Sequence, residues 1–494
     1  MTLFATKSVT HIISESEAGE HQLKRTLGPA NLVALGIGAI IGAGLFSLTG
    51  LAAAEHAGPA VALSMVVAGI GCALAGLCYS EFSCMIPVAG SAYTYAYATL
   101  GEWLAWIIGW DLVLEYAVAA SAVSISWSAY VVSVLHDFGI DLPAQLVAGP
   151  FEAVTFPDGR VITGAANIPA VIIVLLISGL LIIGISESAR ANAVIVVIKL
   201  AVVFTVIGVG WFYIHPANYT PFIPRNTGEF GHFGISGIMA GAGMIFFAYI
   251  GFDAVSTAAQ EAKRPQRDMP IGIIGSLAVC TILYVIFSFI LTGMANYTKL
   301  DVAAPVAVAI DQTPYKWLNE LVKFGIIAGF TSVILVMLLG QSRVFYSMSR
   351  DGLVPKVFSD IHPKFQTPWR SNMLFFLFIA PFSAFLPLKV VGNMTSIGTL
   401  FAFVIVCAAV LVMRRKNPDT PRPFKTPWVP VIPILGMVWN FSMMYSLGWS
   451  NWARLLIWLV IGQAIYFTYS RKRSHLLTSA NLPQKTSESR RGRI

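Results

Sequence analysis

The sequence predicts an all-α integral membrane protein with twelve transmembrane helices, because its composition and the repetition of apolar stretches both lead to that class. Of its 494 residues, 56% are hydrophobic and only 11% are charged, and the mean hydropathy is +0.73. A soluble domain carries about 25% charged residues, so most of the surface of this chain must face lipid. Apolar stretches long enough to cross a hydrocarbon core of ~30 Å, which takes about 20 residues, recur twelve times.

The twelve apolar stretches define the predicted membrane spans in order. They cover 30–51, 60–80, 102–136, 165–185, 187–214, 233–258, 271–295, 318–342, 371–387, 391–413, 429–449 and 451–470. The third span is long enough to tilt strongly or to extend beyond the membrane, whereas the ninth is short. Only a turn at 185–191 separates the fourth span from the fifth, so this pair is the least clearly divided.

The basic residues are distributed unequally between the two sides of this topology. If both termini lie on one side, that side holds 24 Lys and Arg residues, and the opposite loops hold six. An excess of Lys and Arg marks the cytoplasmic side, so we predict that both termini are cytoplasmic. The asymmetry accounts for the formal net charge of +8, which favours contact with anionic lipid and excludes nucleic acid as a partner.

Glycine clusters interrupt two of the predicted spans. The first span contains GIGAIIGAGLF at 36–46, and the sixth contains GAGMIFFAYIGFD at 241–253. Glycine inside a helix costs about 1 kcal/mol relative to alanine, so clusters five spans apart indicate discontinuous helices where two inverted repeats meet. Close helix packing through Gly38 and Gly42 is the alternative that the sequence leaves open. We therefore expect five segments in order. They are an N-terminal segment at 1–28, a first five-helix repeat at 29–214, a second five-helix repeat at 233–414, two further helices at 429–470, and a basic cytoplasmic tail at 471–494.

Three ionisable residues lie in or beside the interior of predicted spans. Glu115 lies in the third span, Lys199 in the fifth, and Asp253 just after the second glycine cluster. An Asp or Lys at the centre of a lipid-facing helix costs about 2.5–3.5 kcal/mol, so we expect these residues to face an interior cavity or one another. Each also has a simpler structural interpretation: pairing within the bundle for Glu115, snorkelling for Lys199 and helix capping for Asp253.

Four longer strings place the chain beside a known family. They are GIGAIIGAGLF, IPVAGSAYTYAYATLGEWLAW, FFAYIGFDAVSTAAQE and GQSRVFYSMSRDGLVP, which start at residues 36, 86, 246 and 340. Through them the chain, from about 25 to 470, resembles the cationic amino acid transporter family of the amino acid, polyamine and organocation superfamily. The resemblance implies the leucine-transporter fold, in which two inverted five-helix repeats contain broken helices 1 and 6 and two helices follow. Ala43 departs from the pattern, because many relatives have a hydroxyl residue there.

The resemblance also implies where an amino acid would bind, namely between broken spans 1 and 6, flanked by spans 3 and 8. The amides of Gly42, Ala43 and Gly44 would hold the α-carboxylate, since a free helix N-terminus favours an anion. Backbone carbonyls released at the two breaks would accept hydrogen bonds from the ammonium group. These carbonyls belong to Ile40, Phe247, Ala248 and Ile250.

The side-chain pocket determines the expected substrate. Met337 on span 8 would line this pocket, which would extend toward Glu115 and Asp253. Because two buried carboxylates favour a cationic side chain, we expect arginine, lysine or ornithine, with small neutral amino acids as the alternative.

Lys199 matches the family position at which a lysine takes the place of a sodium ion in sodium-coupled relatives. We expect its amino group to bind backbone carbonyls near Gly38 and Ile41 and to exchange a proton during alternating access. The expected activity is therefore proton-coupled import or exchange by a secondary active transporter.

Other functional classes lack their sequence signatures. The chain contains no phosphate-binding GxxxxGK[ST] loop, no TVGYG filter and no HExxH motif, so an ATP-driven pump, a potassium channel and a metalloenzyme are not expected. We expect no catalytic residue, metal ion or cofactor, and the partners are an amino acid, protons and the lipid of the plasma membrane. The sequence leaves open a non-transporting amino acid sensor on the same fold, and a small accessory membrane subunit.

Overall fold

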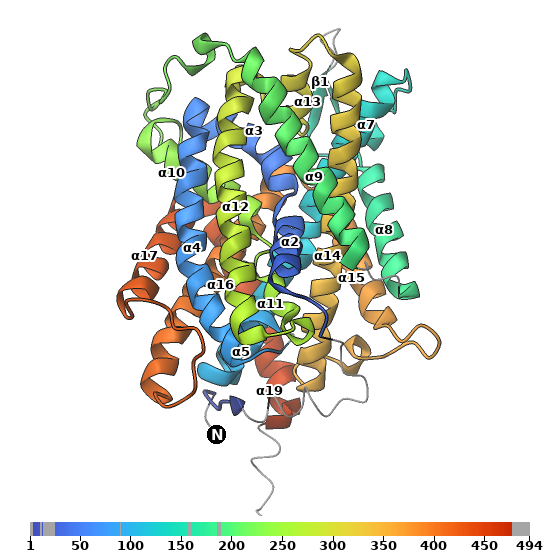
Figure 1. Ribbon diagram of the computed structural model, residues 1–494. Coiled ribbons are helices and arrows are strands. Elements are labelled where there is room, and N and C mark those ends of the chain that lie inside the picture. Colours follow the sequence, from blue (N-terminus) through green and yellow to red (C-terminus); the bar gives the residue numbers. More distant parts are fainter. Residues whose placement is uncertain are drawn as a thin grey trace, which may run out of the picture.

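The structure is a computed structural model, and it describes residues 3–9, 12, 25–88, 90–155, 161–184 and 189–476. Long helices lie side by side and run along roughly one direction (Figure 1). Helix occupies most of each of the twelve stretches predicted as spans. The turn predicted at 185–191 lies partly outside the described residues, as do most of the segments 1–28 and 471–494.

The first half of the chain contains eight α-helices within the described residues. They are α2 (Pro29–Ile40), α3 (Thr49–Ala52), α4 (Val61–Met85), α5 (Ser91–Thr99), α6 (Glu102–Val113), α7 (Ala119–Asp137), α8 (Ile168–Ile183) and α9 (Ala189–Gly210). Short π-helical segments continue these helices at Gly44–Leu48, Ala53–Ala57 and Leu114–Val118. Between α7 and α8, the strands β1 (Ala153–Thr155) and β2 (Val161–Thr163) form a small antiparallel hairpin.

The second half contains the remaining helices. They are α10 (Gly234–Ile245), α11 (Ala254–Thr257), α12 (Pro265–Met294), α13 (Pro305–Ile310), α14 (Lys316–Arg350), α15 (Trp369–Phe385), α16 (Leu388–Lys416), α17 (Val431–Ser446), α18 (Trp449–Ile465) and α19 (Arg471–Arg473). A π-helical segment, Tyr466–Ser470, links the last two. Single 3-10 turns lie at Gly58–Ala60, Ala144–Leu146, Trp211–Tyr213, Pro216–Tyr219, Phe246–Tyr249, Ala259–Glu261, Tyr297–Lys299 and Lys356–Phe358.

Eight helical segments of the described chain are long and apolar enough to cross a membrane. The apolar helices α2, α8 and α17 are shorter than 18 residues, and α2 is short because it ends at the first glycine cluster. Prediction of an all-helical membrane protein is therefore confirmed, whereas the twelve crossings and the inverted relation between the halves stay predictions.

The packing of the long helices places the first glycine cluster in the interior. Helix α12 packs along α4 and α2, and α14 packs along α7 and α9 (Figure 1). Helix α2 also contacts α9 and α14, so it is surrounded on several sides by other helices. The residues from Gly36 to Ile40 are buried as a result.

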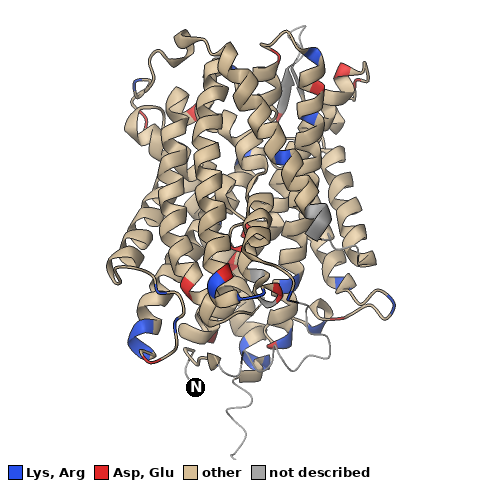
Figure 2. Cartoon of the chain, viewed as in Figure 1, with Lys and Arg blue, Asp and Glu red and all other residues tan. Residues whose placement is uncertain are grey.

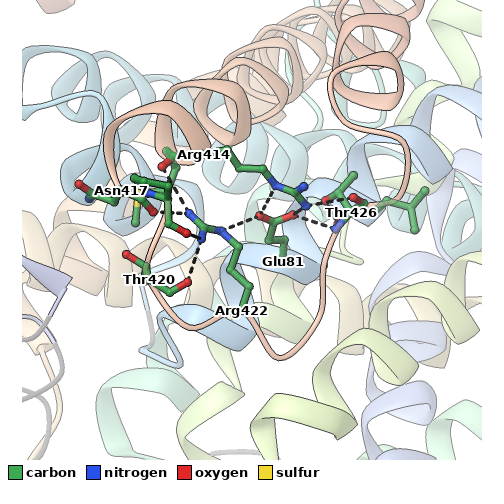
Figure 3. A network of polar contacts seen from close by, with 9 residues as sticks. Glu81, Arg414, Asn417, Thr420, Arg422 and Thr426 are labelled. Carbon is green, nitrogen blue, oxygen red and sulfur yellow. Dashed lines mark hydrogen bonds and ion pairs between the residues drawn. The ribbon is translucent and has the colours of Figure 1, made fainter.

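Charged residues gather at the ends of the bundle. Lys and Arg are concentrated at the end where the N-terminus lies, and the middle of the bundle is almost free of them (Figure 2). At that end a buried acidic residue, Glu81 of α4, is held by two arginines (Figure 3). Arg414 of α16 donates from Nε and Nη2 to the two Glu81 oxygens at 3.0 and 2.7 Å. Arg422 Nε lies 3.3 Å from Oε1, and the Thr426 amide donates to Oε2 at 2.8 Å.

The Glu81 cluster gives a first testable prediction about stability. The Glu81 side chain is only 2% exposed, so Glu81→Gln leaves two arginines without their carboxylate. We expect the free energy of unfolding to fall by about 2–3 kcal/mol, less than for a wholly buried pair because Arg414 is partly exposed. Thermal unfolding in detergent measures this, with Glu229→Gln as the control because the Glu229 side chain is 79% exposed. Equal melting temperatures for the two variants would contradict the prediction.

Candidate functional site

The first break lies between α2 and the helix that follows it. Helix α2 ends at Ile40, Ile41 is extended with ψ of 107°, and helical structure resumes at Gly44. The amides of Gly42, Ala43 and Gly44 donate no hydrogen bond to any residue that the structure describes. Three successive free N–H groups at the start of a long helical segment are the arrangement that binds anions.

The second break lies between α10 and α11. Helix α10 ends at Ile245, a 3-10 turn covers Phe246–Tyr249, and Ile250 is extended with ψ of 136°. Gly251 follows with φ of +116°, a conformation that side-chain-bearing residues rarely adopt. Both interruptions predicted from the glycine clusters are therefore present.

The two breaks touch one another through glycine. A Cβ atom on Gly44 would lie 2.1 Å from Ala248 Cα, and one on Gly251 would lie 2.9 Å from the carbonyl carbon of Ala39. No side chain fits at either position without moving the opposite backbone. Glycine is thus needed for close contact between the two broken helices, which explains why both clusters carry it.

A small cavity lies beside this contact. The volume that the centre of a water molecule can occupy in it is about 10 Å³, which is roughly enough for one water. Seven of the predicted site residues line it: Ile40, Gly42, Ala43, Gly44, Phe247, Ile250 and Met337. The other lining residues are Ala39, Ala119, Val123 and Val333, so the side chains around the cavity are all apolar. Helices α7 and α14 supply four of these side chains, as expected for spans 3 and 8.

The carbonyls freed by the breaks have a partner that the sequence did not reveal. The hydroxyl group of Tyr284, on α12, lies 2.9 Å from the carbonyl oxygen of Ile40 and 3.0 Å from that of Ala248. The carbonyl of Phe247 accepts the Ile250 amide at 3.2 Å. The only signal in the sequence was a tyrosine inside an apolar span, where a phenol usually finds a hydrogen-bond acceptor.

Lys199 of α9 lies against the helix side of the first break. Its side chain is 1% exposed, and Nζ donates to the carbonyl oxygen of Gly38 at 2.5 Å. This is one of the two carbonyls to which the sequence assigned it. Lys199 therefore ties α9 to the last turn of α2, and its role in proton coupling stays a prediction.

Glu115 and Asp253 lie next to each other but outside the cavity lining. Glu115 is in the π-helical segment between α6 and α7, and its carboxyl group lies close to that of Asp253. Tyr116 and Ser91 donate hydrogen bonds to Asp253 Oδ2. No cation pairs with either carboxyl group within the described part of the chain. The structure thus brings the two acids together, as expected, without directing them at the cavity.

Comparison with known proteins identifies the family. A family model described as amino acid permease matches residues 27–465. A branched-chain amino acid permease, BcaP of Bacillus subtilis, is 46% identical over 477 residues, which cover 96% of this chain and 99% of that protein. A methylthioribose transporter of the same species is 43% identical over 475 residues, with the same coverage of 96% and 99%. The vacuolar cationic amino acid transporter 4 of Arabidopsis thaliana is 36% identical and covers 83% of this chain and 66% of its own length. The chain belongs to the amino acid permease family, and it is an integral membrane transporter and not an enzyme.

Proposed function

We propose that this permease carries neutral amino acids with branched aliphatic side chains, coupled to protons, by alternating access. The proposal rests on one observation: the amides of Gly42, Ala43 and Gly44, which have no acceptor among the described residues, border a cavity whose side chains are all apolar. The amides suit a carboxylate, and an apolar lining suits an uncharged hydrocarbon side chain. Together the amides and the apolar lining complement the two ends of an aliphatic amino acid.

The ammonium group of the substrate would lie between the two broken helices. The carbonyls of Ile40 and Ala248 point to one place, because a single tyrosine hydroxyl reaches both. A carbonyl oxygen has two lone pairs, so each can accept from the substrate while Tyr284 remains in place. Backbone carbonyls bind an ammonium group without a buried carboxylate, which agrees with the position of Glu115 and Asp253 outside the cavity.

A cationic substrate has less support in the cavity. That expectation depended on Glu115 and Asp253 lining the side-chain pocket, whereas Val123, Val333 and Met337 line it. A guanidinium group placed against these side chains would lose its hydration without gaining an anion. The relatives are named for different substrates, from branched-chain to cationic amino acids and methylthioribose, so family membership alone does not determine the substrate.

The cavity must enlarge during transport, since it holds about one water in this conformation. Movement of the two broken helices against α7 and α14 would open it toward one side of the membrane. In this proposal Lys199 influences the movement, because it donates a hydrogen bond to the carbonyl of Gly38 in the last turn before the first break. Gain or loss of its proton changes the strength of that bond, which is the proposed basis of coupling.

We propose that the protein lies in the plasma membrane, with the end of the bundle that carries the N-terminus facing the cytoplasm. Lys and Arg gather at that end (Figure 2), as the charge rule for membrane proteins requires.

Uptake of labelled amino acids into proteoliposomes tests the substrate. With an inward proton gradient, we expect leucine, isoleucine and valine to accumulate, and arginine and lysine to accumulate at least about tenfold less. Unlabelled methylthioribose should compete weakly, because it has no carboxylate for the free amides. Uptake of arginine without uptake of leucine would overturn the proposal in favour of a cationic substrate, and binding of leucine without accumulation would indicate a sensor.

Ala119→Leu tests whether the cavity holds the substrate side chain. Ala119 lines the cavity from α7, and an isobutyl side chain in place of its methyl group would fill the small space that remains. We expect the KM for leucine to rise about tenfold and the KM for alanine to change much less. Alanine uptake by the same variant is the internal control for folding. If both substrates lose affinity equally, the cavity is not the side-chain pocket.

Lys199→Ala tests proton coupling. We expect the variant to lose accumulation driven by a proton gradient while it retains exchange of internal for external leucine, since the amides and carbonyls at the breaks remain. Lys323→Ala is the matched control, because Lys323 is likewise buried, at 2% exposed, but pairs with Asp137 at 2.5 Å, away from both breaks. Gradient-driven accumulation that survives in Lys199→Ala would remove Lys199 from the coupling mechanism.

A further inference from the structure

A second and larger cavity lies where the two broken helices meet the last helices of the chain. It measures about 230 Å³, far above the roughly 10–15 Å³ that one water needs. His56 comes from the helical segment after the first break, and Ala240 from the helix before the second break. The opposite wall is formed by the beginnings of α16 and α18 and by the end of α17.

The charged side chains of this cavity are basic. Lys389 of α16 and Arg454 of α18 line it, and none of its lining residues is acidic. Lys389 is paired with Glu55, which lies outside the lining. Arg454 Nη1 donates to Asn451 Oδ1 at 2.6 Å, and the guanidinium has no carboxylate partner among the residues described. Most of its N–H groups are therefore available to a further acceptor.

Backbone and amide groups at the same cavity are also unused. Lys389 and Ser450 belong to the first turns of α16 and α18, so two helix N-termini end here with their partial positive charge. The Ser450 amide donates to no acceptor in the described chain. Asn393 is 7% exposed, and its Oδ1 atom has no hydrogen-bond partner in the described chain. Rotation of this side chain can therefore present its NH₂ group to the cavity.

We propose that this cavity binds an anion through carboxylate or phosphate oxygens, with Arg454 as the main ligand. The guanidinium group of Arg454 and two helix N-termini, together with the Lys389 ammonium group that is shared with Glu55, form a site that favours an anion over a neutral or cationic ligand. A bound anion would contact His56, in the helical segment after the first break, and Arg454 on α18, and would thereby join that segment to α18.

Thermal unfolding of the purified full-length protein tests this site, because a ligand that binds only the folded state raises the melting temperature. The probes are sodium acetate, sodium phosphate and dispersed phosphatidylglycerol, with sodium chloride at equal ionic strength and phosphatidylcholine as references. We expect at least one probe to raise the melting temperature in a saturable way. In Arg454→Gln the half-saturating concentration should rise at least about tenfold. Lys316→Gln, an exposed basic residue outside the cavity, should behave as the unmodified protein.

The outcomes separate the two sources of anion. Saturation by acetate or phosphate assigns the site to a dissolved anion, and a response to phosphatidylglycerol alone assigns it to a lipid headgroup; both support the proposal. If Arg454→Gln does not fold, Lys389→Gln replaces it in the same comparison. The site does not exist if no probe exceeds its reference, or if the cavity variant saturates at the same concentration as the unmodified protein.

Discussion

A chain inside lipid must form its backbone hydrogen bonds within the protein. The proposed transport site depends on two places, the breaks after α2 and α10, where helical backbone hydrogen bonds are interrupted. Helix α2 stops at Ile40, and the amides of Gly42, Ala43 and Gly44 have no acceptor among the residues that the structure describes. Free N–H groups at this depth persist only where protein surrounds them, and α7, α10, α12 and α14 supply that cover. In the proposed site, the polar groups that would bind a zwitterion are thus peptide groups that a continuous helix would have used for its own hydrogen bonds.

Glycine makes this arrangement possible in two different ways. At Gly251 it permits a backbone conformation with positive φ, and at Gly44 it lets one backbone lie directly on another. The breaks are therefore in contact, and the substrate site can be built from both at once. The last turn of α2 is fixed from outside by Lys199 through Gly38.

The sequence predicted the parts of this site that depend on local composition. Apolar stretches located the helices, and the two glycine clusters located the breaks, because helix propensity and span length are local properties. Tyr284 was missed because its role depends on the packing of α12 against α2 and the 3-10 turn, which no pattern within α12 records. The sequence allowed Glu115 and Asp253 to face either the cavity or each other, and it did not decide between these positions, because Glu115 lies in a π-helical segment. Spacing along an ideal helix does not include such a segment.

The position of Tyr284 leads to an imbalance at the meeting point of the two broken helices. A phenol carries one hydrogen, and this one stands between two carbonyl oxygens. At any instant the hydroxyl group can donate fully to only one of the two carbonyl oxygens. Without a substrate, the other oxygen therefore lacks a hydrogen-bond donor. The ammonium group of an amino acid carries three hydrogens that can be donated. In the proposed site, the bound substrate would therefore supply the hydrogen bond that one of the two carbonyls lacks, and its release would remove that bond.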